Sequence, residues 1–181
     1  MAKASATDQA HVVLAVGKEA ILVQRVIEGV MASARKADPA AVRQDIVASN
    51  ESAAGELANA LSPSLFGELT VIVVQGIDGA TDDVGAILLT AIADLPEHVR
   101  LVITHPGGVK GKKLLDTIKK ANVLEAACGE LKAKDLEAAL IAEFRRHNRK
   151  ATAGAITALQ ASIGSGLGEL LAAVSQLCAD T

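Results

Sequence analysis

The feature that most constrains the fold is a run of four β-branched residues, Val-Ile-Val-Val, at positions 71 to 74 of the 181-residue chain. The run lies within Thr70–Gln75 and has no polar residue among its four positions. A strand that carries apolar side chains on both faces has to be covered on both faces, as the strands of parallel sheets are. The run therefore predicts the central strand of a parallel sheet.

Short apolar runs and amphipathic segments alternate along the first two thirds of the chain. Strands are also expected at residues 11–16, 41–48, 99–104 and 122–128, and helices at residues 18–36, 53–61, 82–95 and 112–120. Strands that alternate with helices are typical of an α/β fold with right-handed crossovers. The prediction is a parallel five-stranded sheet with helices on both faces.

The pattern changes near Gly129. Residues 135–144, 153–163 and 167–179 all have helical periodicity, and no further strand is indicated. The sequence therefore predicts an α/β domain over residues 1–129 and a small all-helical domain over residues 130–181.

Composition excludes several classes of function. Half of the residues are hydrophobic, the formal net charge is -3, and Trp and Tyr are absent, so the core is aliphatic and base-stacking platforms are scarce. The N-terminus has no apolar signal segment, and no run reaches the ~20 apolar residues of a membrane span. We expect a cytoplasmic protein without membrane contact.

Cys128 and Cys178 have no partners at metal-ligand spacing, which predicts two reduced, buried thiols and no metal site.

The first strand-helix turn is where a nucleotide phosphate would bind in such a sheet. Gly17 and Lys18 match the end of a phosphate-binding loop, but Val12 replaces its first glycine and Glu19 replaces the Ser or Thr that binds magnesium. The carboxylate of Glu19 would also repel a phosphate. The third strand ends at Gln75, with Asp78 beyond it, so ATP hydrolysis and a bound cofactor are not expected.

Two segments of the chain are basic: residues 110–113, which follow the predicted strand 99–104, and residues 145–150, which follow the predicted helix 135–144. Each segment either forms a solvated helix end or contacts a DNA backbone nonspecifically, and the sequence leaves both interpretations open. The four histidines lie in different elements without a recognisable nucleophile, so no catalytic residue is proposed. The cations of the two segments are Lys110, Lys112, Lys113, Arg145, Arg146, Arg149 and Lys150.

An apolar pair, Leu65 and Phe66, stands in a short segment bracketed by Pro63 and Gly67. The chain has only two aromatic residues, Phe66 and Phe144, and large apolar side chains are usually buried. The pair is either an exposed plug for a partner protein, or Phe66 folds back as a lid over the core. Burial statistics alone leave both interpretations open.

Three stretches resemble one family nearly from end to end. They are 61–68 (LSPSLFGE) before the Val-rich strand, 105–112 (HPGGVKGK) after the next strand, and 163–181 (IGSGLGELLAAVSQLCADT). The chain resembles the δ subunit of the bacterial DNA polymerase III clamp loader, particularly its actinobacterial form. The resemblance implies an AAA+-type first domain that has lost ATPase activity, followed by a lid-like helical domain. Family members continue into a helical collar domain that this sequence lacks, so weaker assembly with other loader subunits is expected.

The resemblance also implies a function. In that family the Leu-Phe pair inserts into a hydrophobic pocket of the ring-shaped sliding clamp and helps to open it, without catalysis by the subunit itself. Carried over, the plug is Leu65 and Phe66, with Leu61 and Ser64 beside it. The implied partners are the sliding clamp, other loader subunits and primer-template DNA. Two competing hypotheses are a degenerate nucleotide-binding enzyme that uses Lys18 and the lysines after Gly108, and a DNA-backbone adaptor that uses the basic segments.

Overall fold

The computed structural model describes residues 11–63, 67–121 and 123–180. The chain divides into two compact units. One comprises Met1–Lys18 with Leu22–Gly129, and the other comprises Glu130–Thr181 with Glu19–Ile21. Among the described residues, no helix is both long enough and apolar enough to cross a membrane.

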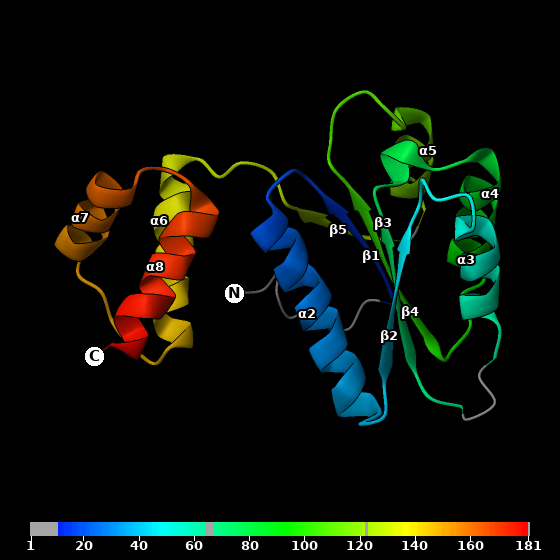
Figure 1. Ribbon diagram of the computed structural model, residues 1–181, viewed down its shortest axis with the longest axis horizontal. Coiled ribbons are helices and arrows are strands. Elements are labelled where there is room, and N and C mark those ends of the chain that lie inside the picture. Colours follow the sequence, from blue (N-terminus) through cyan, green and yellow to red (C-terminus); the bar gives the residue numbers. More distant parts are fainter. Residues whose placement is uncertain (1–10, 64–66, 122, 181) are drawn as a thin grey trace. The chain divides into compact units, whose positions relative to one another are not determined.

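The first unit is built on a five-stranded sheet in which every neighbouring pair is parallel. The strand order is β2-β3-β4-β1-β5 (Figure 1). The Val-rich run is an interior strand, but β4 occupies the middle position, so the prediction that the run is the central strand is wrong. The strands are β1 (Val12–Val16), β2 (Val42–Val47), β3 (Thr70–Gln75), β4 (Val99–His105) and β5 (Leu124–Ala127).

Helices cover both faces of this sheet, as predicted. α2 (Ala20–Ala37) lies on one face, while α3 (Ala53–Leu61), α4 (Asp82–Ala93) and α5 (Lys112–Lys119) lie on the other (Figure 1). A single-turn helix, η1 (Ile77–Gly79), follows β3.

Two separate hydrophobic clusters explain why β3 has no polar face. Val71 and Val73 pack with α2 residues such as Val30, whereas Ile72 and Val74 pack with residues of α3 and α4. Alternate residues of a strand point to opposite faces, so a strand buried on both sides needs an unbroken apolar run. The α/β fold expected from the sequence is confirmed.

Residues 130–180 of the second unit form three helices, α6 (Ala133–Arg146), α7 (Ala153–Ile163) and α8 (Leu167–Ala179) (Figure 1). Thr152 is the N-cap of α7, and its side chain accepts a hydrogen bond from the Ala155 N–H at 3.2 Å. The helices bury one aliphatic set against each other, because each is amphipathic and has no sheet to pack on. The set includes Leu136, Leu140, Ile156, Leu167, Leu170, Leu171 and Val174.

The two thiols differ in exposure. Cys128 is buried and burial raises the pKa of its thiol to about 11, whereas Cys178 is partly exposed. The prediction of two buried thiols is therefore wrong for Cys178.

At about pH 8 only about one Cys128 thiol in a thousand is ionised, and the thiolate is the reactive form. We expect a thiol reagent to modify Cys178 in the native protein and Cys128 only after unfolding. A Cys178→Ser variant, which isolates Cys128, checks this, and rapid native labelling of that variant would contradict it.

Candidate functional site

Helix α3 ends at a shallow apolar groove. Ala53, Leu57 and Ala60 of α3 are buried against the sheet. Leu61, the last residue of the helix, is partly buried and lines an open pocket of about 400 Å³ with α4 residues including Ile87 and Ala91. The predicted site residue Leu61 therefore lies on the surface at which the predicted plug segment begins.

The remaining predicted plug residues, Ser64, Leu65 and Phe66, lie outside the described residues. On the side of α3, the Ser62 N–H and hydroxyl close the helix by donating to Asn59 and Ala58 carbonyls at 3.1 and 3.0 Å. On the side of β3, Gly67 has a φ of 69°, a left-handed value that favours glycine. Helix α3 therefore ends with its C-cap at Ser62, and the described chain resumes at a glycine with a left-handed backbone.

The return of the chain into β3 is held by Asp38. Its carboxylate accepts hydrogen bonds from the N–H groups of Leu69, at 2.8 Å, and Ala40, at 2.9 Å. Leu69 is itself buried in the cluster under α2. Asp38 therefore ties the end of the 62–69 segment to the turn between α2 and β2.

These two backbone donors make the anchor sensitive to acid. The bonds from Leu69 and Ala40 lower the pKa of Asp38 in the folded chain, because they favour its charged form. A depressed folded pKa gives stability that is complete above the unfolded pKa of ~3.9 and is lost as pH falls through the folded value. We expect Asp38→Asn to lower stability at neutral pH and to reduce the dependence of stability on pH below about 4. Urea unfolding of both proteins across this range measures it, and parallel pH profiles would refute it.

The first strand-helix turn is closed by backbone. The Gly17 N–H donates to the His105 carbonyl at 2.9 Å, and the Cys128 N–H donates to the Val16 carbonyl at 2.7 Å. Gly17 has a φ of 146°, and a Cβ added to it would lie 1.9 Å from the carbonyl carbon of Cys128. The main chain after β5 therefore fills the space over this turn.

A glycine-rich loop follows β4 and is anchored by His105. Nδ1 of this buried ring must accept a hydrogen bond, because the Gly107 N–H approaches it at 2.8 Å. Nε2 then carries the proton and donates to the Lys110 carbonyl at 3.0 Å. The two bonds bracket the loop, so His105 has a structural role.

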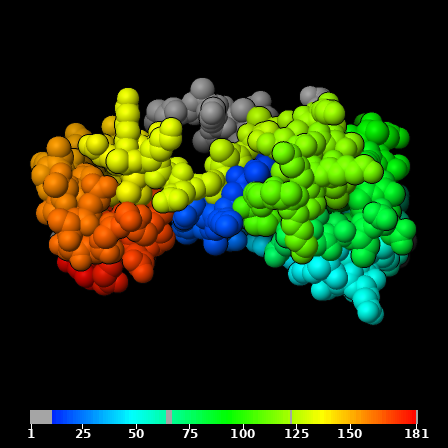
Figure 2. Space-filling model, turned by 90° about the horizontal axis from the view of Figure 1, so that it is seen from above, coloured from blue at the N-terminus to red at the C-terminus, as the bar shows by residue number. Residues whose placement is uncertain are grey.

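The lysines of this loop face solvent. Lys110 lies 3.6 Å from the carboxylate of Asp78 in η1, and its side chain is mostly exposed. Lys112 and Lys113 are exposed and line an open pocket of about 580 Å³ between α4 and α5. Val109, at the tip of the loop, is 86% exposed. Figure 2 shows green and yellow-green atoms of this part of the chain on the surface of the first unit.

The basic segment of the second unit divides into two groups. Arg146 lies 3.3 Å from Glu143, whose side chain is buried, and His147 lies 3.6 Å from the same carboxylate. Arg145, Arg149 and Lys150 instead line a pocket of about 440 Å³. The structure therefore separates Arg146 from the three cations predicted with it.

Glu143, His147 and Ser175 form a cluster that the sequence did not indicate, because Ser175 is 28 positions from His147. The Ser175 hydroxyl donates to the Leu171 carbonyl at 3.0 Å and lies 3.3 Å from Nε2 of His147. The same Nε2 faces Glu143, whereas a Ser-His-acid triad uses opposite ring nitrogens. This geometry does not activate a nucleophile.

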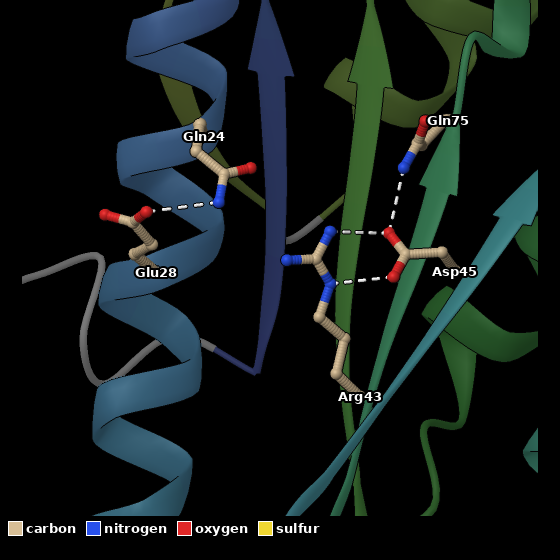
Figure 3. Close-up of polar contacts among 5 residues, drawn as sticks. All are labelled: Gln24, Glu28, Arg43, Asp45 and Gln75. Atoms are coloured by element: carbon tan, nitrogen blue, oxygen red, sulfur yellow. Dashed lines mark hydrogen bonds and ion pairs between the residues drawn. The ribbon is translucent and has the colours of Figure 1, made fainter.

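A second polar cluster lies at the β2 edge of the sheet, where Asp45 accepts hydrogen bonds from Arg43 at 2.6 and 2.8 Å and from Gln75 at 2.8 Å (Figure 3). Gln24 and Glu28 form a separate exposed pair within α2, at 3.1 Å. Polar and charged side chains at a sheet edge disfavour pairing with another chain. Among the described residues, no group of His, Cys, Asp and Glu could hold a metal ion.

Comparison with known proteins gives an informative structural likeness. No protein-family model and no curated protein sequence matches the chain. The Bacillus subtilis DNA clamp loader delta protein superposes with a TM-score of 0.72 over 98% of this chain, at 16% sequence identity. The fold is that of the clamp loader delta protein.

The chain spans 56% of the length of that delta protein. A polymerase III gamma subunit-related protein from Thermotoga maritima has a TM-score of 0.49 and 16% identity, over 76% of this chain and 47% of its own. A Walker-type ATPase from Pyrococcus abyssi has a TM-score of 0.49 and 12% identity, over 94% and 63%.

Proposed function

We propose that this chain is a non-catalytic clamp-loader subunit that binds a sliding clamp through a plug formed by Leu65 and Phe66. The observation that carries the proposal is the likeness to a clamp loader delta protein over 98% of the chain. The family resemblance of the 61–68 stretch supplies the residues of the plug. Residues 1–129 are the clamp-interacting domain in this proposal, and residues 130–181 are a lid-like domain.

The surroundings of the plug support this role. Leu61 lines an open, mainly apolar pocket of about 400 Å³ beside the end of α3, and an exposed apolar surface of this kind suits contact with another protein. Asp38 and Leu69 anchor the far end of the segment. A short segment fixed at both ends loses less conformational entropy on binding than a free tail would.

In this proposal the subunit opens the clamp by binding one conformation of the clamp more tightly than the other. Burial of a Leu or Phe side chain contributes roughly 1.5 to 3 kcal/mol, so two such side chains can anchor a transient interface. A ligand shifts a conformational equilibrium only by its difference in affinity for the two states. We infer that the plug binds an open or strained clamp more tightly than a closed one.

The closed first turn supports a non-catalytic role. A phosphate loop needs glycines that wrap the phosphates ahead of the helix, whereas here Val12 lies in β1 and the Cys128-Gly129 backbone packs across Gly17. Lys18 and Glu19 alone do not form such a loop. Nucleotide titration tests the rival hypothesis: saturable ATP binding that is lost in Lys18→Ala would overturn the non-catalytic assignment.

The direct experiment measures binding of this chain to purified sliding clamp. We expect saturable binding that requires no ATP. Absence of binding at high micromolar concentrations would remove the proposed function.

Contacts of Lys110, Lys112 and Lys113 with primer-template DNA belong to the same proposal, since backbone contacts need only exposed positive charge.

A further inference from the structure

The end of helix α6 gathers positive charge into one pocket. Four of the six Lys and Arg residues of residues 130–181 fall between positions 145 and 150. Three of them, Arg145, Arg149 and Lys150, line an open pocket of about 440 Å³ together with Ile141, Asn148 and Ala151. The lining contains no acidic residue.

The backbone explains why residues separated by a helix end share this pocket. The Arg149 N–H donates to the Phe144 carbonyl at 2.8 Å, and the Asn148 N–H donates to the Arg145 carbonyl at 3.0 Å. Asn148 has a φ of 57°, so these bonds form a Schellman motif with asparagine in the left-handed position. The motif reverses the chain and brings Arg149 and Lys150 back beside Arg145.

The neighbouring side chains have a different partner. Arg146 and His147 face the buried carboxylate of Glu143, at 3.3 and 3.6 Å. Within the described residues, Arg145, Arg149 and Lys150 have no carboxylate partner. Three cations held close together repel one another, and an anion that enters the pocket relieves this repulsion.

We propose that Arg145, Arg149 and Lys150 form a phosphate-binding pocket. Guanidinium groups match the geometry of phosphate oxygens with two parallel hydrogen bonds, and the lysine adds a point charge. Asn148 adds an amide donor at the rim. The phosphate is a diester of a nucleic-acid backbone or belongs to a free polyphosphate, and both present the same oxygens. This pocket is independent of clamp binding by the Leu-Phe plug.

The test uses the full chain and two charge-matched double variants. Arg145→Glu with Arg149→Glu reverses the pocket, while Lys132→Glu with Lys134→Glu makes the same charge change at the opposite end of α6, where both side chains are exposed. Binding is measured by anisotropy of a short labelled DNA duplex and by calorimetry with tripolyphosphate. Thermal unfolding confirms that each variant is folded.

We expect the pocket variant to lose about tenfold or more in affinity at low salt and the control less than about threefold. If the duplex is the ligand, the slope of log affinity against log salt falls by about 0.9 for each phosphate that the variant no longer neutralises. Duplex binding without tripolyphosphate binding assigns a nucleic-acid backbone, and the reverse assigns a free polyphosphate. Binding of neither probe, or equal losses in both variants, overturns the pocket.

Discussion

Replacement of both Leu65 and Phe66 by alanine should weaken sliding-clamp binding by about a hundredfold or more. Each side chain, once buried in the clamp, contributes roughly 1.5 to 3 kcal/mol, and every 1.4 kcal/mol changes affinity about tenfold. Surface plasmon resonance with immobilised clamp measures the loss. The difference should lie mainly in the dissociation rate, because mutants of one interface vary more in dissociation than in association.

A matched control removes apolar surface elsewhere on the first unit. Val42→Ala with Val109→Ala truncates two side chains that are 43% and 86% exposed. This variant should bind the clamp with the affinity of the parent protein. If the Leu65 and Phe66 double variant also binds like the parent, the plug assignment is wrong, whereas equal losses in both variants would indicate a diffuse apolar interface.

Gly17→Ala should destabilise the first unit by about 3 to 5 kcal/mol, a large part of the ~5 to 15 kcal/mol that stabilises a typical domain. The new methyl group would lie 1.9 Å from the Cys128 carbonyl carbon and 2.2 Å from the Gly129 nitrogen. These are backbone atoms, which cannot rotate away as the tip of a side chain can. The positive φ of 146° adds strain for any residue with a side chain. Urea unfolding at equilibrium measures the loss.

Gly55→Ala is the control for this change. Gly55 lies within α3 and nothing is found within 4 Å of an added Cβ, so alanine should stabilise the helix by roughly 0.5 to 1 kcal/mol. Opposite shifts of the two unfolding midpoints are the expected pattern. An unchanged midpoint for Gly17→Ala would show that the main chain after β5 yields easily, and the first turn could then open for a phosphate.

Local periodicity was sufficient to predict the strands and the α-helices. The bounds of α3 and β3 agree with the predicted 53–61 and Thr70–Gln75, because an amphipathic helix and a doubly buried strand leave clear patterns within a few residues. β5 is shorter than predicted, Leu124–Ala127 rather than 122–128. None of its four residues is fully buried and it lies at the sheet edge, so burial imposes a weaker pattern on it.

The candidate sites depend on contacts that the sequence does not display. Arg146 pairs with Glu143 one turn earlier on α6, which could have been anticipated from the spacing of three residues. The grouping of Arg145 with Arg149 and Lys150 requires the left-handed turn at Asn148, and single-residue turns of this kind have little sequence signature outside glycine. The role of Leu65 and Phe66 stays a prediction, because both lie outside the described residues.

The sequence by itself determined that this chain is α/β, with parallel strands, helices on both faces and a helical second part. These properties follow from side-chain patterns within single elements, where hydrophobic burial imposes a period on the sequence. Only the tertiary structure decided that β4 rather than β3 is the middle strand, and that backbone near Cys128 closes the turn at Gly17. Those outcomes depend on contacts between residues far apart in the chain, and no local pattern records which distant segments meet.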